Sequence, residues 1–164
     1  MIPAITWLPD TSGGPPYTKN LPIGIMARPR GGDWFDDEFR DLKRAGVDVL
    51  VSILTPEEER ELQLQDEASL CEQHDIIFVK FPIPDRGVPP MNQQTFDLFH
   101  RLNELVDEGK TLVYHCRMGI GQSSLVAVSL ATMRGSVVET SLLRLEQVQG
   151  KVYPDADEQR QWMV

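Results

Sequence analysis

The segment 111–133 constrains the fold most, because it predicts a strand, a short glycine-containing loop and a helix in immediate succession. The apolar run Thr111–Tyr114 is typical of a buried strand, which continues into His115 and Cys116. The stretch Leu125–Met133 indicates a helix. This order favours an α/β fold in which the loop lies at the carboxyl end of its strand.

Residues that start and stop helices divide the rest of the chain. Four further helices are predicted from capping residues and apolar spacing, at 33–46, from Thr55 through the acidic run 57–61, at 92–109 and at 136–150. Two apolar segments predict buried strands, Asp48–Leu54 and Ile76–Phe81. Strands that alternate with helices predict a mostly parallel central sheet with helices on both faces.

Finer expectations concern one helix face and the N-terminal region. The helix from Asn92 is expected to place four apolar residues on one face, namely Phe96, Phe99, Leu102 and Leu105. An edge strand is expected at Ile5–Leu8. The stretch Pro9–Pro22 is rich in proline, glycine and serine and predicts a long loop.

Composition indicates a globular chain that forms one domain, residues 1–164. Hydrophobic residues make up 41% and charged residues 25%, and no apolar run is long enough to span a membrane or to serve as a secretory signal. Two cysteines argue against a disulfide framework and favour the cytoplasm. The net charge of −9 disfavours nucleic acid and anionic membranes as partners.

The loop after Cys116 has the properties of an anion site with a nucleophile at its floor. Unpaired N–H groups at a helix N-terminus attract anions, and Gly119 and Gly121 allow the backbone to form a concave surface. The same electrostatic field favours the thiolate form of a cysteine. Gln122 replaces the lysine of a nucleotide-binding P-loop, and Ser124 replaces the third glycine of a dinucleotide fingerprint, so both of those sites are excluded.

Five residues of this segment resemble the signature of the cysteine-dependent protein tyrosine phosphatases, which reads His-Cys, five residues, Arg, then Ser or Thr. They are His115, Cys116, Gly119, Gly121 and Ser123. The resemblance implies a phosphatase-like fold without cofactor or metal, in which Cys116 is the nucleophile and Ser123 donates its hydroxyl to the departing sulfur. It also implies a phosphate-binding loop formed by Arg117, Met118, Gly119, Ile120, Gly121 and Gln122.

Asp85 extends the resemblance to the dual-specificity branch of these phosphatases. It lies 31 residues before Cys116, in the segment Phe81–Pro90, and that branch carries its general acid on a loop at about this remove. A carboxylic acid there would protonate the leaving oxygen and then activate water. The aspartate precedes the cysteine, which is the reverse of the order in low-molecular-weight phosphatases and arsenate reductases.

Gln122 departs from the signature, because the family has its phosphate-binding arginine at this position. Glutamine keeps an amide donor but loses the charge and the planar pair of donors. We therefore expect severely impaired turnover with some anion binding retained. Either the protein is a natural pseudophosphatase or the arginine of an active enzyme has been replaced, and the sequence leaves both readings open.

Other polar residues have narrower expected roles. His115 is expected to hold the loop by a hydrogen bond, with tuning of the thiolate as the alternative. His74 and His100 lack metal-ligand spacing and are expected to be surface or hydrogen-bonded residues. Cys71 is expected to be a small core residue, with a disulfide to Cys116 as the alternative.

Four arginines could rim the site and attract anions: Arg28, Arg30, Arg86 and Arg117. For all but Arg117, a solvated surface is the preferred interpretation.

Two functional classes follow. The first is a phosphomonoester hydrolase whose partners are phosphorylated proteins or small phosphorylated molecules, and the second is a module that binds phosphate-like anions without turnover. A thiol redox protein would need a partner cysteine, and only Cys71 is available. The apolar residues Met118 and Ile120 disfavour a phosphoinositide substrate.

Overall fold

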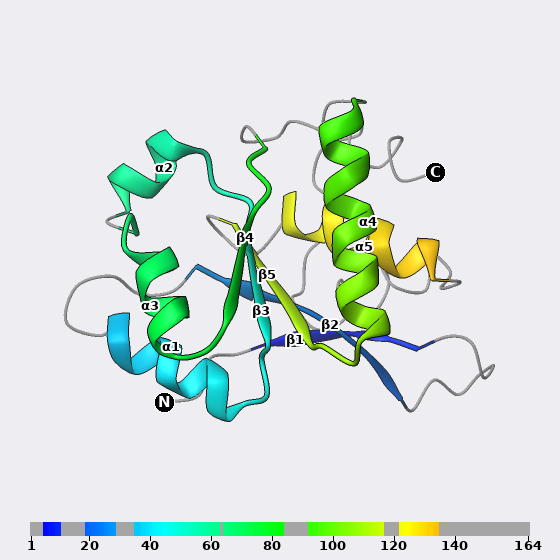
Figure 1. Cartoon of the computed structure of the whole chain (residues 1–164), viewed down its shortest axis with the longest axis horizontal. Coiled ribbons are helices and arrows are strands. Elements are labelled where there is room, and N and C mark those ends of the chain that lie inside the picture. The colour runs from blue at the N-terminus through cyan, green and yellow to red at the C-terminus, as the bar shows by residue number, and fades with distance from the viewer. Residues whose placement is uncertain are drawn as a thin grey trace.

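A five-stranded sheet forms the centre of the molecule (Figure 1). The structure, a computed structural model, describes residues 5–10, 19–28, 35–62, 64–83, 92–116 and 122–134. Their elements in chain order are β1 (Thr6–Pro9), β2 (Asn20–Ala27), α1 (Phe35–Arg44), β3 (Val49–Ser52), α2 (Pro56–Glu61), α3 (Glu67–Gln73), β4 (Ile77–Lys80), α4 (Gln93–Asp107), β5 (Leu112–Cys116) and α5 (Gln122–Met133).

The strand order is β1-β2-β5-β3-β4, so β5 occupies the middle of the sheet. It pairs in parallel with β2 and β3, and β3 pairs in parallel with β4, whereas β1 pairs antiparallel with β2. The predicted mostly parallel sheet is therefore confirmed. Parallel strands end at the same edge, so the carboxyl ends of β2, β3, β4 and β5 lie together.

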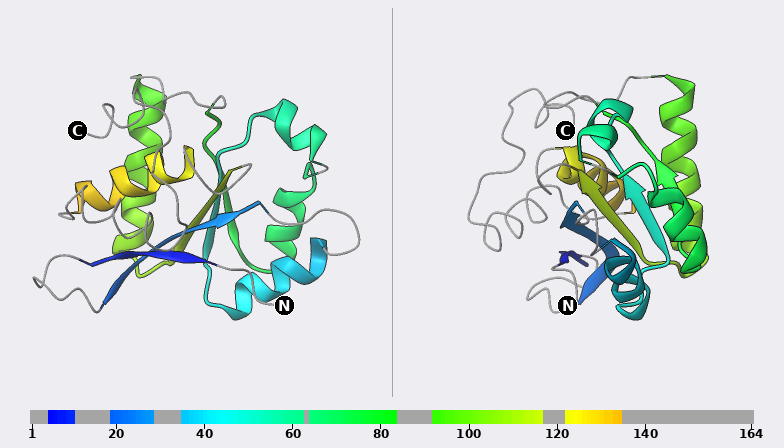
Figure 2. Two further views of the ribbon diagram at one scale, coloured as in Figure 1. Left: turned by 180° about the vertical axis from the view of Figure 1, so that it is seen from behind. Right: turned by 90° about the vertical axis from the view of Figure 1, so that its left-hand side faces the viewer.

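Helices cover both faces of the sheet (Figure 2). On one face α4 and α5 pack over a core that includes Tyr114, Leu102 and Leu130. On the other face α1 and α3 enclose a second core, which includes Phe39 and Cys71. Successive residues of β5 point to opposite faces, so the strand contributes to both cores.

Local sequence explains where several elements begin and end. The predicted capping box at the start of α2 is present, since the Thr55 hydroxyl accepts from the Glu58 backbone N–H at 3.3 Å and Glu58 Oε1 accepts from the Thr55 backbone N–H at 3.2 Å. Gly46 and Gly109 follow α1 and α4 with φ of +93° and +88°, a conformation that glycine adopts without strain.

The structure corrects two sequence predictions. The loop predicted at Pro9–Pro22 is too long, because β2 begins at Asn20 and includes Pro22. Phe96 is not on the buried face of α4; it is 52% exposed, and Thr95 is buried instead. The buried face runs from Thr95 to Phe99 and Leu102, which is the helical spacing of i, i+4 and i+7.

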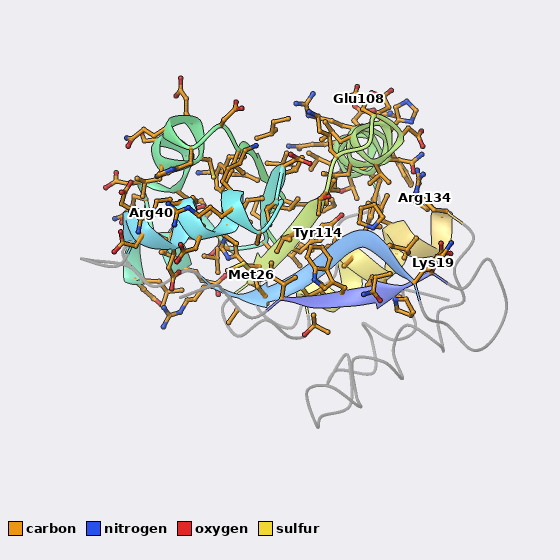
Figure 3. The ribbon with its side chains drawn as sticks, turned by 90° about the horizontal axis from the view of Figure 1, so that it is seen from below. Lys19, Met26, Arg40, Glu108, Tyr114 and Arg134 are labelled. Carbon is orange, nitrogen blue, oxygen red and sulfur yellow. The ribbon has the colours of Figure 1, made fainter. Side chains whose placement is uncertain are left out.

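One interaction ties α5 to α4 near the end of the described chain (Figure 3). Arg134 Nη1 lies 2.8 Å from an Asp107 carboxylate oxygen and 2.7 Å from Asn103 Oδ1. The helix predicted at 136–150 lies outside the described residues.

Candidate active site

β5 carries His115 and Cys116 to the carboxyl edge of the sheet. In the parallel pairing, Cys116 lies beside Ala27 of β2 and His115 lies beside Ser52 of β3. The backbone carbonyl of His115 accepts a hydrogen bond from the Ile53 N–H at 2.9 Å. Strands on both sides therefore fix the backbone that leads into the loop.

α5 begins at Gln122, so a connection of only five residues joins it to Cys116. Connections this short keep a strand end and the following helix start close together in α/β proteins. The start of the helix is three residues earlier than predicted, which adds its unpaired N–H groups to the end of the loop. Cys116 itself is 3% exposed and belongs to the core on the α4 and α5 face of the sheet.

Several predicted site residues lie outside the described parts of the chain. They are Asp85, Arg117, Met118, Gly119, Ile120 and Gly121. The backbones of Gln122 and Ser123 form the first residues of α5, but their side chains are not described.

The segment that leads to Asp85 can be followed as far as Ile83. Beyond β4, the Phe81 N–H donates to the Ser52 carbonyl at 2.8 Å and the Ile83 N–H donates to the Ile53 carbonyl at 3.1 Å. These bonds continue the pairing with β3 past the end of both strands. The chain therefore runs toward the same sheet edge as Cys116 until two residues before Asp85.

His115 points away from the Cys116 side of the sheet and meets Glu67 of α3. Its Nε2 lies 2.6 Å from Glu67 Oε1, and the two side chains are 0% and 1% exposed. The contact is close, but its geometry is not that of an aligned hydrogen bond. Among the described residues, His115 Nδ1 and Glu67 Oε2 have no hydrogen-bond partner.

Glu67 was not singled out from the sequence, because 48 residues separate it from His115. One signal was available. Glu67 and Cys71 are four residues apart and share a helix face, and Cys71 is a core residue. A carboxylate on a core-facing side of a helix needs a partner.

Cys71 is a core residue, as expected, and neither it nor Cys116 forms a disulfide. Burial raises the pKa of the Cys71 thiol, and the nearby Glu67 carboxylate raises it further. The two cysteines belong to cores on opposite faces of the sheet. This arrangement keeps them apart, so the structure does not support the alternative of a disulfide between them.

The remaining histidines have surface partners. His74 Nε2 lies 2.9 Å from Asp36 Oδ1, and His100 Nε2 lies 2.9 Å from Glu104 Oε1. In the ranges that the structure describes, no group of three or more histidine, cysteine, aspartate or glutamate residues is arranged to hold a metal ion. The same part of the chain contains no helix long and apolar enough to cross a membrane.

Solved structures of phosphatases share this fold. The kinase associated phosphatase, with its catalytic-site cysteine replaced by serine, superimposes with a TM-score of 0.82 at 19% identity, over 99% of this chain and 93% of that chain. TpbA of P. aeruginosa in complex with pTyr gives 0.62 at 13% identity, over 96% and 88%. The human tyrosine phosphatase-like serine/threonine/tyrosine-interacting protein gives 0.64 at 12% identity, over 85% and 87%.

Sequence comparison identifies the family. No functionally curated protein matches the chain. The model of the family described as "Polymorphic toxin system, DSP-PTPase phosphatase" matches residues 24–135, which include the second half of β2, the strands β3, β4 and β5, and the loop after Cys116. The chain belongs to this family of dual-specificity-type phosphatases.

Proposed function

We propose that the protein hydrolyses phosphate monoesters through a cysteinyl-phosphate intermediate, with Cys116 as the nucleophile. One observation carries the proposal: Cys116 ends the central strand of a parallel sheet, five residues before α5, within the segment that matches the phosphatase family. A thiol at this point lies where the N–H groups of a helix start favour bound oxyanions.

The proposed reaction has two steps. The Cys116 sulfur attacks phosphorus and the ester oxygen leaves with a proton from Asp85, while backbone N–H groups of residues 117–122 bind the phosphoryl oxygens. Asp85 then takes a proton from water, and the resulting attack on the phosphocysteine releases phosphate. Ser123 donates its hydroxyl to the sulfur as it leaves. His115 supports the loop from the opposite face of the sheet, where it meets Glu67.

We propose that turnover by this chain is severely impaired, because Gln122 stands where the family has its phosphate-binding arginine. A guanidinium about 4 Å from a phosphoryl charge contributes about 4 kcal/mol at an effective dielectric near 20. Loss of a preorganised donor to the transition state typically lowers the rate by about 10²- to 10³-fold. The same residue favours the second candidate function, a phosphate-binding module without turnover, because the backbone N–H groups of the loop do not depend on it.

Three chains test the proposal: the protein itself, Gln122→Arg and Cys116→Ser. We expect Gln122→Arg to hydrolyse an aryl phosphate about 10²- to 10³-fold faster than the parent, and to form a phosphocysteine that acid quenching traps. Cys116→Ser is the matched control and should be inert. If Gln122→Arg is as inactive as Cys116→Ser, the hydrolase proposal is wrong.

Vanadate binding then distinguishes the alternative. A module that binds without turnover is expected to bind vanadate in the parent chain, measured by calorimetry, although Gln122→Arg is inert. If vanadate does not bind either, both candidate functions are wrong.

The substrate class is proposed at the level of a phosphorylated residue or a small phosphorylated molecule. The binding of pTyr by the similar structure TpbA supports phosphotyrosine as one member of the test panel. The match to almost all of the kinase associated phosphatase supports one domain over residues 1–164. Cys71 and Cys116 form no disulfide, which supports a reducing compartment such as the cytoplasm.

A further inference from the structure

A buried carboxylate, Glu67, lies against the histidine that precedes the proposed nucleophile. It stands at the first residue of α3, and its side chain is 1% exposed. The contact with His115 Nε2 crosses from α3 to the central strand of the sheet. In the reaction proposed above, neither group touches the phosphate, since both lie on the face of the sheet opposite to Cys116.

Stability alone does not explain this pair. Removing a carboxylate and an imidazole from water is costly, and apolar residues of similar size are often at least as stabilising. The cost is greater here because the contact is not an aligned hydrogen bond, and Glu67 Oε2 and His115 Nδ1 lack partners among the described residues. Incompletely satisfied buried groups in a folded protein often mark a functional site.

The geometry connects the pair to the sulfur. A carboxylate oxygen 2.6 Å from Nε2 favours the tautomer with a proton on that nitrogen, because a lone pair there would face the oxygen's lone pairs. The carboxylate therefore fixes the orientation of the ring and which of its nitrogens carries a proton. The ring belongs to the residue next to Cys116, so positive charge there favours a thiolate.

The described neighbours of His115 in the sheet, Met26 and Ser52, carry no charge. Ser52 lies beside His115 in the sheet and is uncharged; the Leu54 N–H lies 3.4 Å from its hydroxyl oxygen. Lys80, next to Ser52 in the register, pairs with Glu59 of α2 at 3.3 Å.

The helices on this face carry further acidic groups, since Glu38 and Asp41 of α1 are buried. On α3 itself, the Glu67 carboxylate interacts electrostatically with Cys71. Where α1 packs against α3, Asp36 contacts His74, at the opposite end of α3 from Glu67.

We propose that Glu67 is a positioning residue that acts through His115 to hold the side chain of Cys116 in its reactive, ionised form. This inference rests on the proposed function, because it assigns Glu67 a role in the reactivity of that nucleophile. Glu67 does not contact substrate in this scheme.

The test measures alkylation of Cys116 by iodoacetamide from pH 5 to 9, with the modified peptides separated by mass spectrometry. In Glu67→Gln, which keeps the shape but removes the charge, we expect the midpoint of the Cys116 profile to move up by about half a pH unit or more. This corresponds to a reaction about threefold slower at pH values below the midpoint. Glu59→Gln is the matched control, since it removes another buried carboxylate on a neighbouring helix, and should leave the profile unchanged.

Cys71 serves as an internal probe of folding, because it lies on the same helix as Glu67 and is 0% exposed. If Cys71 stays unmodified and the Cys116 profile does not move in Glu67→Gln, the proposal is overturned. If Cys71 becomes reactive, a double-mutant cycle tests the proposal. It compares the Cys116 profile of His115→Asn with and without Glu67→Gln. The proposal requires that Glu67→Gln has no further effect on Cys116 once His115 is replaced, and an undiminished effect overturns it.

Vanadate separates this inference from the proposed function. Vanadate that protects Cys116 of the parent chain from alkylation supports an oxyanion site over the sulfur. Absence of protection contradicts the proposed function, whatever the effect of Glu67→Gln. Protection together with an unmoved profile contradicts only the role of Glu67.

Discussion

The buried thiol of Cys71 is expected to make the protein lose stability at alkaline pH. Cys71 is 0% exposed, and burial together with Glu67 raises the pKa of its thiol in the folded protein. In the unfolded chain the same thiol titrates near 8.5. Above about pH 8.5 the unfolded state therefore gives up a proton that the folded state keeps, and the equilibrium shifts toward unfolding.

The magnitude follows from proton linkage. The contribution of Cys71 is fully present below pH 8.5 and falls by about 1.4 kcal/mol per pH unit above it. Between pH 8.5 and pH 10 the free energy of unfolding should fall by about 2 kcal/mol. Burial also raises the pKa of the Tyr114 hydroxyl. Its contribution to the free energy of unfolding therefore also falls as the pH rises above about 10.

Urea unfolding in the presence of a reductant measures this loss at half-unit steps from pH 7.5 to pH 10. Cys71→Ala removes the titrating group. Its free energy of unfolding should therefore lack the fall of about 2 kcal/mol between pH 8.5 and pH 10. Cys116→Ala keeps Cys71 and should retain the slope of the parent. Equal slopes for Cys71→Ala and the parent would refute the reasoning, because the thiol would then titrate alike in both states.

Three further substitutions test other parts of the structure. Gly24→Ala should lower the free energy of unfolding in urea by about 1–3 kcal/mol, because its Cβ would lie 2.6 Å from Ile5 Cγ2 and 2.9 Å from Trp7 Cε3; an unchanged midpoint would contradict this packing. Thr55→Ala should cost about 1 kcal/mol by the same assay, through loss of the capping box, and a neutral effect would argue against the cap. Arg28→Gln should weaken vanadate binding about threefold or more by calorimetry, since Arg28 follows the β2 residue that pairs with Cys116; unchanged affinity would place its side chain away from the site.

Local sequence signals were sufficient for most of the sheet and its helices. The Asp48–Leu54 and Ile76–Phe81 segments are mostly apolar, and they form β3 and β4 with ends trimmed by one or two residues. The β2 strand was missed because Pro22 and Gly24 interrupt its apolar pattern. Gly24 is tolerated for a tertiary reason, since side chains before and in β1 pack over it.

In the site, as in the fold, short sequence segments predict some features, whereas others depend on contacts made only in the tertiary structure. A cysteine between a strand and a glycine loop is visible over ten residues, and its place at the edge of the parallel sheet follows from the order of the elements. The partner of His115 depends on how α3 packs against the sheet, and no spacing in the sequence encodes that contact. Sequence reasoning assigned His115 to the loop, whereas the structure shows its ring facing α3.

The position of Glu67 bears on how the loss of an arginine at position 122 should be interpreted. A chain that binds phosphate only through backbone N–H groups needs no ionised sulfur, so a buried carboxylate behind His115 would bring it cost without benefit. A nucleophile needs that ionisation at every turnover. If Glu67 controls the Cys116 profile, the machinery for nucleophilic attack is intact around Gln122, and the replacement affects transition-state binding alone. Restoration of activity by the single change Gln122→Arg is then the expected result, with no second compensating substitution.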